Sequence, residues 1–251
     1  MIHINQLRAR KSIVMEGGAQ YLLYADENGV WESRLQNLEY LSEPRPLLHP
    51  SVDVHSVAGW DAPRFSYNTL MVVCESAHDG RRGIRLFSAD REEQLPGHAK
   101  YLPYSGILTP PDWDCTDGCL LGRDLIFTRR AKNSCSIYTV PLSSSCRECA
   151  GRPKRIVAGG EAPVLWYTYG YQPGVSMLYF RRGKACVAIA DSWTPEGPWK
   201  TLDMPYPISG CYASLFISLD GSFMAAIGTP EGNMQFCYIE GRGESLVLIP
   251  Q

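Results

Sequence analysis

A unit of about fifty residues repeats along the whole chain, and this repeat limits the possible folds more than any other feature of the sequence. Each unit contains a short apolar run rich in aromatic and β-branched residues. The five runs begin at Tyr21, Leu70, Asp124, Met177 and Phe223. Because such runs are typical of β-strands and recur at nearly constant intervals, the sequence predicts one supersecondary unit used five times.

Further strand-like segments surround each of these runs. A second segment follows after a polar turn, as in "GIRLFSAD" and "CVAIADSW", and a shorter segment such as "GPWKTLDMP" closes the unit. Segments such as "DAPRFSY", from Asp61, and "EAPVLWY", from Glu161, open it. Four short strands per unit are typical of a propeller blade.

We therefore expect an all-β, five-bladed β-propeller with four antiparallel strands per blade, as a single domain. No long segment has helical periodicity, and 18 prolines and 23 glycines interrupt the chain at strand-like intervals. The last unit contains its own closing strand, "SLVLIP", so the ring can close without a borrowed strand. A two-sheet sandwich is the alternative, since it also uses regularly spaced short strands. The expected blades span residues 1–50, 51–100, 101–158, 159–207 and 208–251.

The composition is that of an ordinary globular protein. Of 251 residues, 45% are apolar and 20% are charged, and the net charge of -2 requires neither an acidic nor a basic partner. No apolar run has the length of a signal peptide or a membrane span, so we expect a cytoplasmic protein without membrane or nucleic-acid partners and without a cofactor. The nine cysteines are an odd number and favour a reducing compartment. Four of them lie in or beside apolar runs: Cys74, Cys135, Cys186 and Cys237.

Several motifs together resemble a known family. The stretches "GGEAPVLWY", "VAIADSWTPEGPW" and "SLFISLDGSFMAAIG" are similar to the five-bladed arabinanase and β-xylosidase type of glycoside hydrolases, best over residues 105–230 and little before residue 60. In that family a Glu-Gly-Pro carries the general acid, and here the matching residue is Glu161. The resemblance implies an enzyme that cleaves glycosidic bonds with Glu161 as proton donor and a second carboxylate opposite it.

The sequence departs from that family at three positions. The opening strand of the first unit, where the family has its catalytic base, reads "RARKSIV" and has no acid. Thr109-Pro110 stands in place of an Asp-Pro, and Cys211 or Tyr212 in place of a histidine. The hydrolytic apparatus is thus rearranged. Three functions stay open: a modified carbohydrate-active enzyme, a non-catalytic binding propeller, and a reuse of the pocket for cyclisation, elimination or isomerisation.

Three acids and three tryptophans are candidates for an axial site. In a propeller the opening strands line the axis and begin at one mouth, so we expect Asp61, Asp112 and Glu161 to converge there from adjacent blades. Tryptophans of the same segments offer flat faces for a sugar, or else pack between blades. These residues are Trp60, Trp113 and Trp166.

Arginine pairs follow the second strand-like run of three consecutive units. Arg82, Arg129 and Arg181, each with an adjacent arginine, are expected on the face that carries the mouth. They form either a positive rim for a small anionic ligand or ordinary hairpin turns kept soluble by charge. Tyr212 completes the set of candidate ligand contacts.

Four cysteines have nearly the spacing of zinc ligands. "CTDGC" contributes Cys115 and Cys119, and "CREC" contributes Cys146 and Cys149. If the two segments lie at one end of a blade, the four thiols meet and bind zinc. Reduced structural cysteines are the alternative, and the sequence does not decide between the two.

Overall fold

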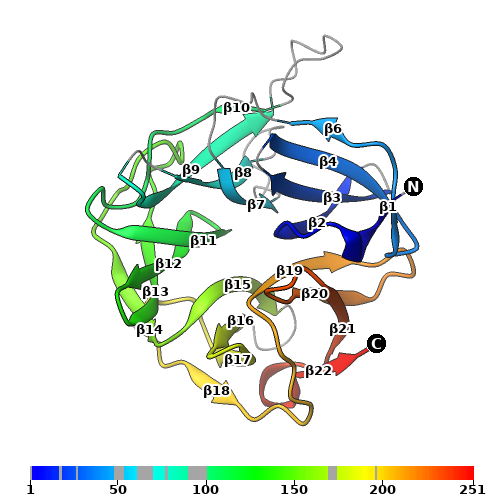
Figure 1. Ribbon diagram of the computed structural model, residues 1–251. Coiled ribbons are helices and arrows are strands. Elements are labelled where there is room, and N and C mark those ends of the chain that lie inside the picture. Colours follow the sequence, from blue (N-terminus) through cyan, green and yellow to red (C-terminus); the bar gives the residue numbers. More distant parts are fainter. Residues whose placement is uncertain are drawn as a thin grey trace.

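The computed structural model describes residues 2–16, 19–26, 28–47, 54–60, 70–76, 79–89, 101–168, 174–195 and 197–251. Over these ranges the chain is a β-propeller whose sheets are arranged around a central axis (Figure 1). Apart from strands they contain two 3-10 turns, Ile4–Gln6 and Gly243–Ser245, and no α-helix, which confirms the all-β class. Within the same ranges no helix has the length and apolar character needed to cross a membrane.

Four of the sheets each consist of four antiparallel strands that follow one another in the chain. The first contains β7 (Val54–Trp60), β8 (Leu70–Ser76), β9 (Arg82–Ala89) and β10 (Tyr101–Pro103). The second contains β11 (Asp114–Leu121), β12 (Asp124–Ala131), β13 (Ser134–Pro141) and β14 (Lys154–Ala158). The third contains β15 (Glu161–Thr168), β16 (Gly174–Arg181), β17 (Lys184–Ala190) and β18 (Lys200–Leu202). The fourth contains β19 (Tyr212–Ile217), β20 (Phe223–Gly228), β21 (Met234–Glu240) and β22 (Val247–Pro250).

The sheet nearest the N-terminus has six strands in the order β1-β5-β4-β3-β2, with β6 paired to β4. Its members are β1 (Ile2–His3), β2 (Lys11–Glu16), β3 (Ala19–Asp26), β4 (Gly29–Gln36), β5 (Tyr40–Leu41) and β6 (Arg45–Pro46). The propeller and its four-stranded antiparallel sheets are therefore confirmed. The number of blades and their boundaries stay predictions, because this sheet is built differently from the others.

The opening strand of the second unit differs from the expectation. The sequence predicts it from Asp61, by analogy with "EAPVLWY", but the strand that pairs with β8 is β7, with Trp60 opposite Leu70. The valines of "VHSVAGW" supply the β-propensity of this strand. Asp61 and the rest of "DAPRFSY" lie outside the described residues, as does the side chain of Trp60.

The strands next to the innermost ones form the core. In Figure 1 the innermost strands around the axis are β2, β7, β11, β15 and β19. The next strands outward, which pair with them, are β3, β8, β12, β16 and β20; we call these the second strands. The apolar runs that reveal the repeat fall on these second strands, and their side chains are almost completely buried, as for Phe127, Leu178 and Ala226. Both faces of such a strand are covered by neighbouring sheets, which explains why the runs are continuous rather than alternating.

We call the six-stranded sheet of β1–β6 the first sheet and the sheet of β19–β22 the last sheet. Side chains connect the two, since the described strands include none that both sheets share. We call this junction the closing seam. The backbone N–H of Ile13 in β2 donates to Ser214 Oγ of β19 (2.8 Å), and the same hydroxyl donates to the carbonyl of Ile13 (3.2 Å). The backbone N–H of Met234 donates to Asn5 Oδ1 (2.9 Å). A hydrogen bond from a backbone N–H to a side-chain hydroxyl also joins the second and third four-stranded sheets, where the N–H of Ala162 donates to Thr128 Oγ1 (2.8 Å).

We predict that Ser214→Ala lowers the free energy of unfolding by about 2 kcal/mol, because it leaves a buried backbone donor and acceptor of Ile13 without their partner. Equilibrium unfolding in urea measures the change. Ser209→Ala is the matched control, since Ser209 is exposed, and it should change stability little. Equal effects of the two substitutions would contradict this role of Ser214.

Candidate functional site

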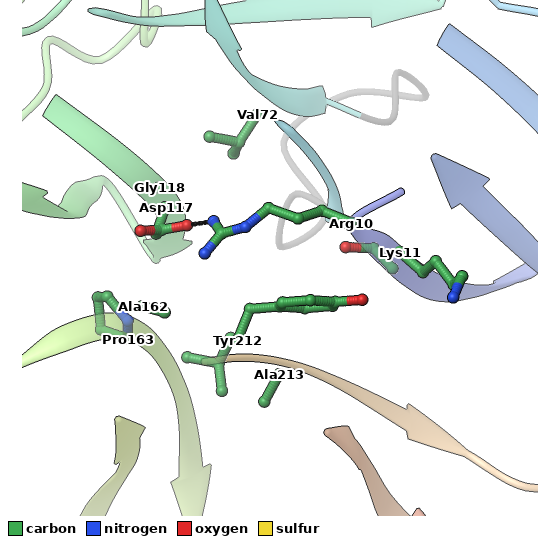
Figure 2. A pocket seen from close by; sticks show the side chains of 11 residues that line it. Arg10, Lys11, Val72, Asp117, Gly118, Ala162, Pro163, Tyr212 and Ala213 are labelled. Carbon is green, nitrogen blue, oxygen red and sulfur yellow. Dashed lines mark ion pairs between the residues drawn. The ribbon is translucent and has the colours of Figure 1, made fainter. Parts of the chain in front are cut away.

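A small cavity lies on the axis of the propeller, between the inner strands (Figure 2). Its volume is about 40 Å³, which is enough for a few water molecules but far below the roughly 300 Å³ of a small ligand pocket. The residues around it are Arg10, Lys11, Ser12, Val72, Asp117, Gly118, Ala162, Pro163, Val164, Tyr212 and Ala213. We call this space the axial cavity.

A β-bulge in β11 aims Asp117 at the axial cavity. The pairing of β11 with β12 shifts between Thr116 and Cys119, and Asp117 has a left-handed backbone (φ 56°) that Asp tolerates better than most residues. Gly118 is needed next to it, since a Cβ there would lie 2.8 Å from Val72 Cγ1. The Asp-Gly pair thus serves a bulge rather than a hairpin turn.

A second bulge lies at the start of β15. The register with β16 shifts between Glu161 and Val164, and Ala162 has φ 49°. For a non-glycine residue this conformation costs roughly 1–2 kcal/mol, and the hydrogen bond from its N–H to Thr128 holds it in place. The bulge puts Ala162 and Pro163 in the lining of the axial cavity and Glu161 just outside it.

Arg10 crosses the axis from the chain just before β2 and forms an ion pair with Asp117, as the dashed line in Figure 2 shows. The guanidinium carbon lies 5.2 Å from the ring centroid of Tyr212, a cation–π contact. Burial lowers the pKa of Arg10 and raises that of Tyr212 to about 12. At neutral pH the cavity therefore contains a neutral phenol, beside the ion pair of Arg10 with Asp117, whose side chain is only 5% exposed.

Arg130 of β12 connects Asp117 to Glu161. Its Nη2 lies 3.4 Å from Asp117 Oδ2 and 2.7 Å from Glu161 Oε2, so one nitrogen serves both carboxylates. Its Nε donates to Thr116 Oγ1 (3.1 Å), which fixes the plane of the guanidinium. Arg10, Asp117, Arg130 and Glu161 form a chain of alternating charges, which we call the axial network.

The axial network leaves neither of its carboxylates unengaged. A glycosidase needs one carboxyl group that carries a transferable proton and a second that is free to act on the sugar or on water. Here Glu161 accepts from Arg130, and Asp117 accepts from Thr116 and is paired with both arginines. Of the axial network, Arg10 and Asp117 line the axial cavity itself.

Lys11 is the second cation beside the axial cavity, but its amino group points away from Arg10 and Asp117 (Figure 2). The side chain is 1% exposed, and its Nζ donates to the carbonyl of Gly232 in the last sheet. Burial lowers the pKa of Lys11 to about 8. Lys11 is therefore still mostly protonated at pH 7 and loses its proton around pH 8.

Asp112, Trp113 and Arg129 lie elsewhere than expected. Asp112 is exposed in the turn before β11 and does not line the axial cavity, because the strand starts two residues later. The guanidinium carbon of Arg129 lies 4.0 Å from the ring centroid of Trp113, and Trp113 also packs against Tyr138 with centroids 4.9 Å apart. These contacts belong to the core of the second four-stranded sheet.

The other predicted contacts are also structural, except for Tyr212, which lines the axial cavity. Trp166 packs edge to face on Phe223 between sheets (5.8 Å between centroids). Arg82 pairs with Asp114 (2.6 Å), which raises the pKa of Arg82 and lowers that of Asp114.

Arg181 is exposed, and it donates to the carbonyl of Ala158 (3.2 Å). Taken together, the arginines of the three turns engage separate partners. They do not converge on the axial cavity, except that Arg130, the neighbour of Arg129, takes part in the axial network.

The four cysteines with zinc-like spacing do not meet. Cys115 belongs to one core cluster and Cys119 to another, because they lie on opposite faces of β11. Cys149 donates to the carbonyl of Leu108 (2.9 Å), and burial raises the pKa of Cys115 and Cys119 to about 12. None of the nine cysteines forms a disulfide, and the described residues contain no group of three metal-binding side chains.

Sequence reasoning misses Arg10 and Asp117, and it includes Arg130 only as the neighbour of Arg129. Asp117 lies inside "CTDGC", which the sequence analysis interprets through its cysteines as a candidate zinc-binding segment. An Asp-Gly inside a strand-like run nevertheless indicates a bulge. Arg130 stands beside the predicted Arg129, but strand alternation sends the two side chains to opposite faces. Arg10 could have been found only by asking what replaces the missing acid of the first sheet.

No protein-family model matches this sequence, and no curated protein matches it. The fold is nevertheless similar to that of several solved carbohydrate-active enzymes. An endo-arabinase from Bacteroides thetaiotaomicron superposes with a TM-score of 0.71 at 16% identity, over 100% of this chain and 96% of that one. A thermostable family-43 glycoside hydrolase gives 0.74 at 15% identity, over 96% and 92% of the two chains.

A GH43_1 enzyme from Xanthomonas citri, solved with xylotriose, gives a TM-score of 0.67 at 12% identity, over 96% of this chain and 91% of that one. These similarities confirm, at the level of the fold, the relationship to arabinanase and β-xylosidase propellers that the motifs indicate. The chain has a glycosidase-like propeller.

We predict that Asp117→Asn lowers the free energy of unfolding by about 2–3 kcal/mol, because it removes the anion between two partly buried guanidinium groups. Thermal or urea unfolding measures the loss. Asp79→Asn is the control, since Asp79 pairs with Arg81 on an exposed turn, and it should change stability little. A wild-type stability for Asp117→Asn would show that the axial network is not structural.

We predict a pH-dependent effect of Lys11→Met. The pKa of Lys11 is about 8 in the folded chain and 10.5 ordinarily, so the unfolded chain binds more protons between these values and the contribution of Lys11 to stability rises with pH there. The variant should therefore gain most over the wild type at pH 7, up to about 3 kcal/mol, and lose this gain by about pH 10.5. Urea unfolding at several pH values measures the difference, and a pH-independent difference would refute the prediction.

Proposed function

We propose that this chain is a five-bladed, glycosidase-like propeller that binds a small carbohydrate-type molecule at its axial mouth and does not hydrolyse it. We count the six-stranded sheet as the fifth blade, because β2, β3 and β4 follow one another outward from the axis as the strands of the other sheets do. The observation that carries the proposed function is the axial network.

The axial network supports binding rather than cleavage. Arg10 stands in the strand region where the related hydrolases have their catalytic base, and a guanidinium cannot accept a proton from water. Arg10 and Arg130 instead present rigid, planar sets of N–H donors, which suit a carboxylate. We therefore take the ligand to be a sugar that carries a carboxylate, held between the two guanidinium groups and the ring of Tyr212.

The ligand must displace part of the axial network, since the axial cavity itself is too small for a sugar ring. Arg130 is 32% exposed and Arg10 22%, so both are accessible from the solvent. A ligand carboxylate takes the place of Asp117 or Glu161 as the partner of one arginine, and the displaced carboxylate loses that partner. This exchange predicts modest affinity, because one ion pair is broken as another forms.

A second candidate is an enzyme with Glu161 as its general acid. It is favoured by the position of Glu161 at the axial end of β15, next to Ala162 and Pro163 in the cavity lining. For this function Glu161 has to leave Arg130 and take up a proton. Hydrolysis and other proton-dependent reactions, such as elimination or isomerisation, share this requirement.

The experiment is calorimetric titration of the purified chain with glucuronate and galacturonate, with glucose and galactose as the neutral counterparts. We expect the sugar acids to bind, and Arg10→Ala to weaken their binding at least tenfold while circular dichroism shows an intact fold. Arg181→Ala is the control, because it removes an exposed guanidinium outside the axial network, and it should leave the affinity unchanged.

The same preparations are tested for release of p-nitrophenol from arabinofuranoside, xylopyranoside and glucuronide substrates. We expect none above background. If release occurs and Glu161→Gln lowers it by roughly 10² to 10⁴ fold, the chain is a hydrolase and the binding proposal is wrong. If the sugar acids bind equally well to Arg10→Ala, the axial network is not the binding site.

A further inference from the structure

We propose a second ligand site, separate from the axial network, in a recess where the first and last sheets meet. The recess has a volume of about 380 Å³, which lies within the range of small-molecule pockets. Its walls come from four parts of the chain: residues 3–5 at the end of β1 and the start of the 3-10 turn Ile4–Gln6, the turn between β4 and β5, β21, and Gln251. We call it the seam cavity and assign it to a neutral sugar of one or two rings.

Carboxamides dominate the polar lining of the seam cavity. Asn37, Gln235 and Gln251 bring three of them, each able to donate and to accept hydrogen bonds as a sugar hydroxyl does. Asn5 brings a fourth, whose Oδ1 already accepts from the N–H of Met234, so that it offers a ligand only the donors of its NH2 group. Glu39 adds a carboxylate to the lining. Among the described lining residues there is no lysine or arginine, so the site has no cation for a carboxylate or phosphate and its chemistry differs from that of the axial network.

The lining of the seam cavity also includes an imidazole and apolar side chains. His3 Nδ1 accepts from the N–H of Asn5 (3.2 Å), so in the neutral imidazole the proton lies on Nε2. Phe236 is held edge to face against Phe216 (6.2 Å between centroids). Its ring and the side chain of Leu38 supply the apolar surface on which the face of a sugar packs.

The turn between β4 and β5 is strained in a way that serves this site. Asn37 and Leu38 both have left-handed backbones (φ 52° and 60°), as the central residues of a tight hairpin turn require. Glycine is the usual second residue, whereas leucine costs roughly 1–2 kcal/mol there. The strain keeps an apolar side chain in the lining, where glycine would leave none.

A ligand in the seam cavity contacts both sides of the closing seam of the propeller. The first sheet contributes His3, Asn5 and Asn37, and the last contributes Gln235 and Phe236. Such a ligand binds only while the two sheets are together, so it stabilises the closed ring by mass action. Binding should therefore raise the melting temperature, which gives a second readout that needs no activity.

The test uses the full chain with xylobiose, maltose and lactose as neutral probes. Saturation-transfer NMR detects binding, and differential scanning fluorimetry measures the shift in melting temperature. We expect at least one probe to bind with millimolar affinity and to raise the melting temperature. Gln235→Ala and Asn37→Gly should each weaken it about tenfold, which corresponds to the loss of one hydrogen bond.

Asn37→Gly is the decisive variant, because glycine adopts the left-handed backbone without strain and the fold is retained. Arg181→Ala is the control, because it removes an exposed guanidinium outside both sites, and it should leave the binding of neutral probes unchanged. The two seam substitutions should leave the binding of glucuronate unchanged, so failure of this site and failure of the axial site are distinguishable. The proposal is overturned if no probe binds, or if binding survives both seam substitutions or is lost in Arg181→Ala.

Discussion

The ion pair between Arg10 and Asp117 is the contact around which the axis of this propeller is organised. It joins the first sheet to the second of the four-stranded sheets across the centre of the ring, and Arg130 extends it to Glu161 on the next sheet. Without Asp117, two guanidinium groups would face each other at the centre of the ring, where neighbouring sheets approach most closely. The bulges in β11 and β15, with their strained residues, hold the carboxylates of this chain of charges in place.

The rest of the fold follows from the five apolar runs, which can be recognised in the sequence alone. A run such as "MLYF" is continuous because neighbouring sheets cover both faces of its strand, and this is what made the repeat visible. The strand before β8 was predicted one segment too late, since the Asp-Ala-Pro at residue 61 resembles the Glu-Ala-Pro at residue 161. Local similarity is a weaker guide than pairing, because pairing depends on partners distant in sequence.

The candidate site was only partly predictable for the same reason. Tyr212 was predicted to contact a ligand and lies at the axial cavity, and Glu161 was placed correctly at the start of its strand. Asp112 and Trp113 were assigned to the mouth because they precede an inner strand, yet the strand begins after them and they face outward or into the core. The Asp-Gly of "CTDGC" indicates the bulge that brings in Asp117, but the close approach of Val72 in β8 to Gly118 depends on a partner distant in sequence.

The closing seam distinguishes this ring from a propeller that is fastened by a shared strand. In the described residues the N-terminal sheet and the last sheet are joined by side-chain hydroxyl, amide and ammonium groups, those of Ser214, Asn5 and Lys11, rather than by a backbone ladder. Separating them therefore breaks no strand pairing, and each sheet keeps its own hydrogen bonds when the ring opens. We therefore expect amide protons shielded by this seam, such as that of Ile13, to exchange with solvent through local opening of the ring rather than through global unfolding.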